Sequence, residues 1–79
     1  MAVRKYVVVT HDATNVILKQ QGLHVFSTEV VIPRSSIASV SARRGELYVA
    51  TSSGVTYVVM PGIRRGQRNL TNAAFGTDG

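Results

Sequence analysis

The chain has 79 residues, of which 44% are hydrophobic and 16% charged, and nine Lys and Arg against four Asp and Glu give a formal net charge of +5. So high a hydrophobic fraction with so few charges excludes an intrinsically disordered protein. The absence of cysteine excludes a disulfide framework, a thiolate metal site and a cysteine nucleophile. A chain of this length forms one domain that buries roughly 60% of its unfolded surface, so we expect a thin core that self-association would reinforce.

The first residues, MAVRKYVVVTHD, place only a short apolar stretch behind Arg4 and Lys5. A signal peptide needs an apolar core of roughly 7–15 residues, and a membrane-spanning helix needs about 20. We therefore expect neither an export signal nor a membrane span. Together with the missing cysteines, this favours a cytoplasmic protein, or one made in the cytoplasm and built into a larger particle.

A two-residue alternation of side-chain character, rich in β-branched residues, runs from residue 4 to residue 60 and is typical of β-strands. Turn-prone stretches interrupt it: HDATN after the first run, Gln21-Gly22 after the second and Pro33 after the fourth. The close spacing of the second and third runs around Gly22 indicates a hairpin. We expect strands over residues 4–10, 15–20, 23–27 and 28–33.

The segment VVIPRSSIASV, residues 30–40, breaks an apolar run at Pro33 and resumes apolar spacing at Ile37 and Val40. Proline has no amide hydrogen for a sheet ladder, and the serines that follow Arg34 can hydrogen-bond the turn backbone. We therefore predict a corner where one strand ends and the next begins in a new direction, with Ile37 and Val40 pointing inward. Arg34 either projects from this corner toward a partner or is a solvated turn residue.

The stretch GELYVATSSGVTYVVM, residues 45–60, predicts a hairpin whose turn is Ser-Ser-Gly. One face of its first strand holds Leu47, Val49 and Thr51, and one face of its second holds Val55, Tyr57 and Val59. No βαβ spacing is present. The pattern therefore predicts a mainly β fold, a small antiparallel barrel or sandwich of about six to seven short strands, over residues 1–60.

The pattern changes in the C-terminal segment, residues 61–79, PGIRRGQRNLTNAAFGTDG. Ile63, Leu70 and Ala74 recur at helical spacing, and Gly76 is a typical helix stop. We predict a short helix from about Gln67 to Phe75, with an irregular tail as the alternative.

The order of these elements, with its corner of the pattern I-P-x-x-S-I-x-x-V from Ile32 to Val40, resembles the small bacterial pleckstrin-homology-like domains over about residues 6–60. In such domains this segment lies between the first strands and a closing hairpin. The resemblance implies that residues 30–40 form the corner at which the sheet turns.

Residues that carry catalysis or hold metals are few. Adjacent residues at a strand end point to opposite faces, so the neighbours His11 and Asp12 do not form a catalytic dyad. Without cysteine, isolated His11 and His24 do not make a zinc site. The acidic residues, none of which pairs closely with another in the sequence, are Asp12, Glu29, Glu46 and Asp78. We expect no enzyme activity, no cofactor and no metal site.

Arginine is the more informative signal because it falls in two clusters, Arg43-Arg44 before a turn glycine and IRRGQR after the last strand. Guanidinium groups bind phosphate and carboxylate in a bidentate way. The partner is a nucleic acid or an acidic protein, unless these side chains only keep a thin apolar domain soluble. We predict partner-binding roles for Arg34, Arg43, Arg44, Arg64, Arg65 and Arg68.

Several predicted strands are apolar on both faces, so either the C-terminal segment covers the second face or part of the sheet is an oligomer interface. We favour a homo-oligomer. The predicted function is a non-enzymatic interaction module that binds another protein or self-assembles through its loops and the arginine-bearing C-terminal segment. The alternatives are a small nucleic-acid-binding β-barrel and a viral or phage particle component.

Overall fold

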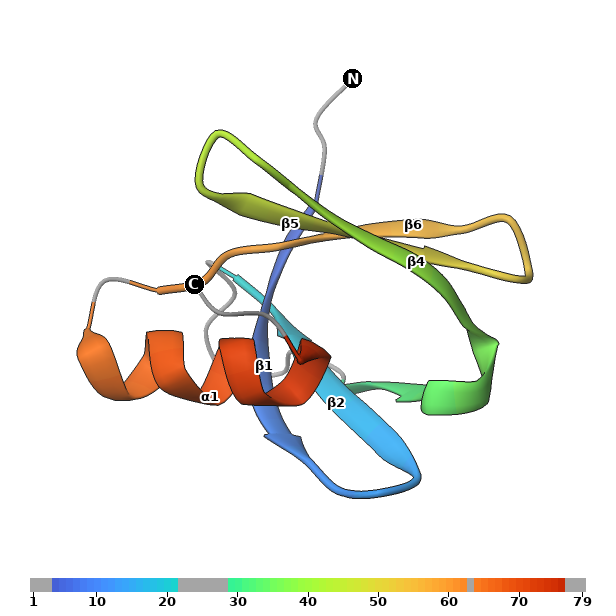
Figure 1. Cartoon of the computed structure of the whole chain (residues 1–79), viewed down its shortest axis with the longest axis horizontal. Coiled ribbons are helices and arrows are strands. Elements are labelled where there is room, and N and C mark those ends of the chain that lie inside the picture. The colour runs from blue at the N-terminus through green and yellow to red at the C-terminus, as the bar shows by residue number, and fades with distance from the viewer. Residues whose placement is uncertain (1–3, 22–28, 63, 77–79) are drawn as a thin grey trace.

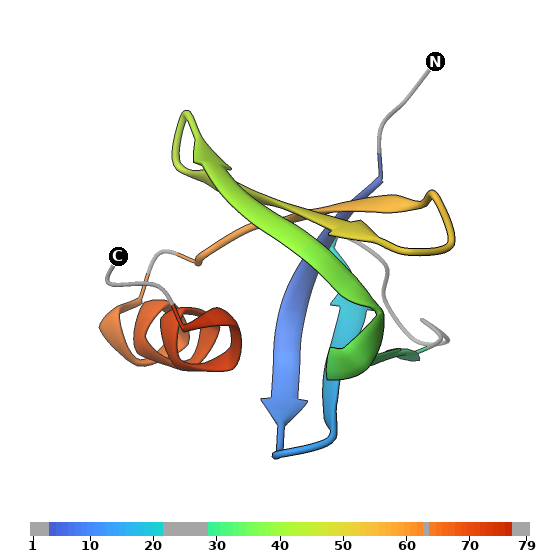
Figure 2. The same ribbon diagram turned by 45° about the vertical axis from the view of Figure 1, so that its right-hand side comes forward.

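The computed structural model describes residues 4–21, 29–62 and 64–76, and shows a twisted sheet with one helix packed against it (Figures 1 and 2). The strands are β1 (Lys5–His11), β2 (Asn15–Gln20), β3 (Glu29–Pro33), β4 (Ile37–Arg43), β5 (Glu46–Thr51) and β6 (Thr56–Val59). A 3-10 turn, η1 (Arg34–Ser36), joins β3 to β4, and the helix α1 (Arg65–Phe75) follows β6. The strand expected over residues 23–27 lies outside the described residues.

The strands form one six-stranded sheet in the order β3-β2-β1-β6-β5-β4. The mainly β fold with a C-terminal helix is therefore confirmed. Neighbouring strands are antiparallel except β1 and β6, which run parallel with Lys5 beside Val58 and Tyr6 beside Val59. The sheet is therefore mainly antiparallel with one parallel pair, which the sequence pattern could not reveal because alternation along a strand does not record the direction of its neighbour.

The sheet is open, because β3 and β4 are its two edges and do not pair with each other. The chain passes from one edge to the other through η1, and within the sheet the two three-stranded meanders pair through the parallel contact of β1 with β6. Figure 2 shows β4, β5 and β6 crossing over β1 and β2. Of the predicted barrel or sandwich, the described strands do not close into a barrel and form one open sheet.

The predicted corner lies where the sequence placed it. Pro33 ends β3 in an extended conformation, and the Ser36 hydroxyl donates to the Pro33 carbonyl at 2.8 Å. The Ser36 carbonyl in turn accepts the amide of Ser52 at 2.8 Å, which ties the corner to the β5–β6 turn. Ile37 and Val40 are partly buried against the core, as predicted.

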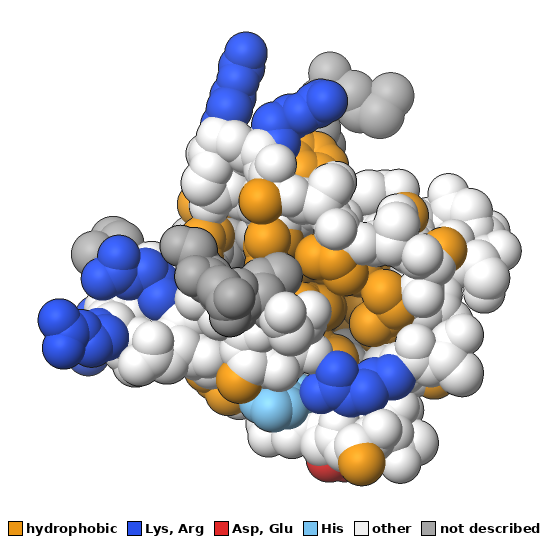
Figure 3. Space-filling model, in the orientation of Figure 1, with side chains coloured by type: hydrophobic (Ala, Val, Ile, Leu, Met, Phe, Trp, Pro, Cys, Tyr) orange, Lys and Arg blue, Asp and Glu red, His pale blue; other side chains and the backbone are white. Residues whose placement is uncertain are grey.

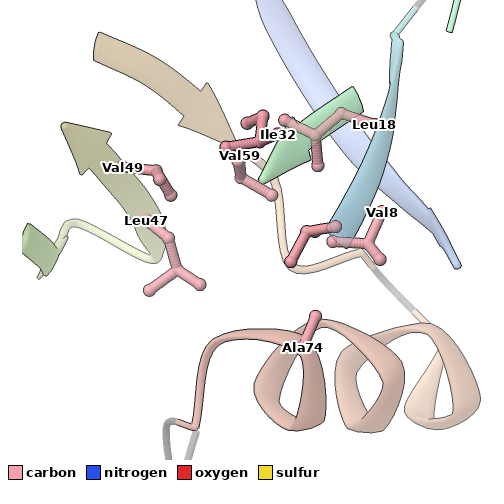
Figure 4. Packing of buried hydrophobic residues seen from close by; sticks show 8 residues of the cluster. Val8, Leu18, Ile32, Leu47, Val49, Val59 and Ala74 are labelled. Atoms are coloured by element: carbon pink, nitrogen blue, oxygen red, sulfur yellow. The ribbon is translucent and has the colours of Figure 1, made fainter. Parts of the chain in front are cut away.

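One hydrophobic core joins both meanders and the helix (Figure 4). Val16, Leu18, Val49 and Val59 have no exposed surface, and neither has Ala74 of α1. These five side chains come from four different elements that lie far apart in the sequence. The helix therefore covers the core face of the sheet, whereas Val31, which alternates with buried Ile32, is 55% exposed on the other face. Cover by the helix thus does not account for the apolar residues of this second face.

The C-terminal helix is confirmed, and it begins at Arg65, two residues before the predicted start. It ends as predicted at Gly76, which adopts the left-handed conformation at φ 68° and donates its amide to the Asn72 carbonyl. Leu70 and Phe75 pack against the core cluster. Within the described residues, no helix has the length and apolar character that crossing a bilayer requires.

The β5–β6 hairpin is confirmed as well. Its predicted inner residues Leu47, Val49 and Thr51 are buried, and the Thr51 hydroxyl donates to the Val55 carbonyl across the turn at 2.7 Å. Val55, placed on the inner face of the returning strand, is instead 47% exposed. It precedes the first residue of β6, so the inward alternation starts only at Tyr57.

Candidate functional site

A hollow of about 500 Å³ lies between the tip of the β4–β5 hairpin, the connection from β6 to α1 and the first turn of α1. In Figure 1 the hairpin tip lies at the upper left and the helix start at the left, and Figure 3 shows Lys and Arg side chains in two separate groups, one at the top and one at the left. The residues that line the hollow are Gln21, Gly45, Met60, Pro61, Gly62, Arg64 and Gln67.

The hairpin tip places the first arginine cluster. Arg44 and Gly45 are its central residues and both have positive φ, 53° and 78°, as in a two-residue type I′ turn. A non-glycine residue in this region is uncommon and costs about 1 kcal/mol of strain. Both Arg43 and Arg44 are exposed, and the Arg43 guanidinium carbon lies 6.0 Å from the ring centroid of Tyr48.

The connection from β6 to α1 places the second cluster. Gly62 has a φ of 96°, and a Cβ added there would lie 2.3 Å from Cγ of Gln67, so only glycine fits. The Gln67 side-chain amide donates to the Val8 carbonyl at 2.9 Å. β6 pairs with β1 at Lys5 and Tyr6, so the Val8 carbonyl lies past the end of this pairing and accepts its hydrogen bond from Gln67 instead of from β6. The same bond fixes the first turn of α1 on the sheet.

Five exposed arginines lie on the segments beside the hollow, and we name them the arginine rim: Arg43, Arg44, Arg64, Arg65 and Arg68. Of these five, Arg64 lines the hollow itself. Within the described part of the chain, their guanidinium groups make no hydrogen bond or ion pair. Arg64 is the N-cap residue of α1 and supplies no side-chain cap, and the first turn holds no acidic residue. The N-terminal end of a helix macrodipole is positive and is stabilised by anions. Arg64, Arg65 and Arg68 place cations there and so oppose the macrodipole.

The acidic residue nearest to the rim in the described structure, Glu46, is neutralised by the fold. Its Oε2 lies 2.6 Å from the Lys5 ammonium, and the hydrogen bond and charge of this carboxylate raise the pKa of Lys5 above its usual value. The Tyr48 hydroxyl approaches Oε1 of Glu46 at 3.4 Å. The rim therefore keeps its positive potential, because Lys5 balances the one carboxylate beside it.

Arg34 lies apart from the rim and serves the fold. Its Nε donates to the Asp12 carbonyl at 2.6 Å, its Nη1 to the Ala74 carbonyl at 2.6 Å, and its Nη2 meets His11 Nδ1 at 3.1 Å. Since a guanidinium group only donates, Nδ1 is the acceptor in this last contact. The solvated alternative for Arg34 was thus wrong, whereas its predicted partner-binding role stays a prediction beside this structural one.

The neighbours His11 and Asp12 belong to the same corner. The Asp12 carboxylate accepts the backbone amides of Asn15 at 2.7 Å and Thr14 at 2.8 Å, which lowers the pKa of Asp12 below its usual value. These bonds close the β1–β2 turn, so the carboxylate orders backbone. The described residues contain no group of three or more His, Asp or Glu side chains that could hold a metal ion.

Of the six predicted arginines, Arg64 lines the hollow, Arg43, Arg44, Arg65 and Arg68 lie on the segments beside it, and Arg34 lies apart. Sequence reasoning missed the lining residues Gln21, Met60 and Gln67, because nothing in their local pattern shows that they meet. Gly62 had a signal, since a glycine directly after a proline marks a sharp turn. Comparison with protein-family models, curated proteins and solved structures finds no match to this chain.

Proposed function

We propose that this protein is a non-enzymatic binding module that holds an acidic segment of a partner protein on the arginine rim. One observation carries the proposal: Gly45 of the hairpin tip and Arg64 of the helix start line the same hollow. Each of the two arginine clusters therefore has a residue, or the direct neighbour of one, in the wall of one hollow. Positive charges on two sides of a hollow raise the potential for an anionic ligand there.

The electrostatics favour an anionic ligand. The rim arginines lack carboxylate partners within the described residues, and the arginines at the start of α1 oppose the helix macrodipole. A bound carboxylate relieves both effects, because it pairs with a guanidinium fork and lies at the positive end of the helix. Solubility alone requires charges somewhere on the surface, but it does not require them around one hollow.

The aromatic side chains favour a protein ligand over single-stranded nucleic acid. Binding single strands uses exposed aromatic faces beside the basic groups. Here Tyr6 and Tyr57 pack edge to face with ring centroids 5.3 Å apart, Tyr48 lies under Arg43, and Phe75 packs on the core. Every aromatic side chain among the described residues is at least partly buried.

Fluorescence anisotropy tests the proposal with a labelled Glu-rich peptide, its Gln counterpart, single-stranded DNA, duplex DNA and RNA. At about 50 mM salt we expect the Glu-rich peptide to bind and the Gln peptide not to bind, with affinity falling by about 150 mM as screening grows. The variants R43A/R44A and R64A/R65A/R68A should each weaken binding at least about tenfold, because each removes one side of the rim.

Arg65→Ala and Lys19→Ala form a matched pair, since each removes one exposed positive charge and Lys19 lies on β2, outside the arginine rim. Lys19 precedes the lining residue Gln21 but does not itself line the hollow. We expect Arg65→Ala to weaken peptide binding about fivefold and Lys19→Ala to leave it within about twofold. Equal losses would mean that only net charge matters. Binding of duplex DNA without binding of the acidic peptide would overturn the proposal in favour of a nucleic-acid partner.

The resemblance to small bacterial pleckstrin-homology-like domains, the cytoplasmic location and the viral or phage alternative stay predictions.

A further inference from the structure

The two edges of the sheet differ in how they resist pairing with another chain. Natural edge strands are blunted by brevity, proline or charge. β3 spans five residues, begins at Glu29 and ends at Pro33. β4 spans seven residues, Ile37–Arg43, has no proline and carries its one charge at its end. Within the described residues, β4 pairs only with β5 and its other side has no strand.

The side chains along β4 are small and exposed, and their order is symmetrical. Residues 38–42 read Ala-Ser-Val-Ser-Ala, a palindrome centred on Val40. In an antiparallel pair with a twofold axis at Val40, Ser39 lies opposite Ser41 of the second copy, and Ala38 opposite Ala42. Each of these pairs matches small with small, and a twofold interface requires this self-complementarity.

We propose that a second copy of this chain pairs antiparallel with the free edge of β4, on a twofold axis at Val40. Directly opposite residues share a sheet face, so Val40 of the second copy lies on the core face beside Val40 of the first. A bulge at Ala38 in the β4–β5 register limits the regular pairs of this ladder to residues 39–41, and Ala42 and Arg43 face the bulged part of the second copy. This pairing is independent of the proposed function.

The core face of β4 favours the addition of a strand from a second copy. Figure 3 shows apolar side chains at the surface between β4 and α1. Ile37 and Val40 are only partly buried, as are Leu70 and Phe75 of the helix. A strand added beside β4 extends the sheet over this apolar opening and removes more of it from water. It also satisfies the unpaired backbone groups of the edge.

Charge does not oppose the pairing. In this register Arg43 lies opposite Ile37 of the second copy, so the two arginine rims stand at opposite ends of the shared ladder. Seven residues of strand extend about 20 Å, more than twice the screening length of about 8 Å at physiological salt. Both rims also stay open to ligand, because neither lies at the axis.

Single-cysteine variants test the register, and any introduced cysteine is unique because the chain has none. Opposite residues in an antiparallel pair have Cα atoms about 4.5–5.5 Å apart, within the range for a disulfide. Val40→Cys should therefore form a covalent dimer under mild oxidation. Ser39→Cys, Ser41→Cys and Thr56→Cys, the last on β6, should not. Cross-linking of the residue 56 variant at least as readily as the residue 40 variant would overturn the proposal.

Charged variants at Ser39 and Ser41 test the same edge without relying on oxidation, and both side chains are exposed. Analytical ultracentrifugation from about 10 µM to about 1 mM should show wild-type dimer formation. S39K/S41K and S39E/S41E, each facing its own charge, should each raise the dimer dissociation constant about tenfold. An equimolar mixture of these two variants should restore dimers, and Val31→Lys on the other edge should have no effect. A monomeric wild type at every concentration, or a mixture that stays monomeric, would refute the pairing.

Discussion

The two ends of α1 use arginine in opposite ways. At the C-terminal end, the Arg34 guanidinium donates to the Ala74 carbonyl, so a cation meets the negative end of the helix macrodipole. At the N-terminal end, Arg64 and Arg65 stand at the positive end without an acidic residue in the first turn. Charge therefore stabilises the helix at one end and opposes it at the other.

The difference follows from the acceptors within reach. Arg34 starts η1 beside the turn of β1 and β2, where two backbone carbonyls and one imidazole nitrogen converge on its guanidinium. The rim arginines have no such acceptors in the described structure. Arginine therefore holds the fold where carbonyls surround it, and is available to a partner where they do not. Stability and binding measurements should separate the two roles.

The largest expected effect is at the C-terminal end. Arg34→Ala removes hydrogen bonds from a charged donor to two backbone carbonyls, so we expect a loss of about 3 kcal/mol in the free energy of unfolding. For a domain of this size the melting temperature should fall by roughly 10–20 °C. Arg34→Lys should recover little of it, since an ammonium group cannot reproduce the fork. A loss below about 0.5 kcal/mol, as at an ordinary surface site, would show that the Arg34 contacts are not structural.

The next largest effect on stability concerns the connection that positions the N-terminal end of α1. Gly62→Ala forces a side chain into a positive φ and against Cγ of Gln67, so we expect it to destabilise the fold by about 2 kcal/mol in urea denaturation. Gly66→Ala is the matched control, because nothing lies within 4 Å of its added Cβ and it stands in the helix. This second change should stabilise by about 0.5–1 kcal/mol. Equal effects of both substitutions would contradict the observed packing of Gln67 on Gly62.

The smallest effect on stability should come from the rim itself. Arg65→Glu places an anion in the first turn of α1, so we expect the free energy of unfolding to rise by about 0.5 kcal/mol. Binding of the Glu-rich peptide should nevertheless fall at least about tenfold, because the change reverses a rim charge. Thermal unfolding and anisotropy on the same sample measure both. A variant that is less stable yet binds normally would remove the distinction between the two ends of the helix.

The strands show how far local pattern reaches. Period-two alternation predicted β1, β2, β3 and the β5–β6 hairpin with bounds close to those observed, because a side chain on a half-buried strand faces the core at every second residue. The same alternation could not reveal the parallel contact of β1 with β6, which joins segments from opposite ends of the chain. It also missed the exposure of Val55, which depends on where a tight turn ends.

The candidate site divides in the same way. Composition and clustering predicted that the arginines are exposed and available to a partner, because cations in turns and at element ends are solvated unless acceptors surround them. Tertiary structure alone decided which segments lie beside each arginine. Gln67 packs on Gly62 and bonds Val8, which fixes the helix start on β1, while Ala74 places its carbonyl against Arg34.

The sequence by itself determined the strand pattern, the corner at Pro33, the helix stop at Gly76 and the basic character of the surface, since each depends on neighbouring residues. The order of the strands, the open edges and the separation of Arg34 from the arginine rim were decided only by tertiary structure. These features depend on contacts between residues that are distant in the chain. The contacts form because Leu18, Val49 and Ala74 are buried in one core, which positions their elements beside one another.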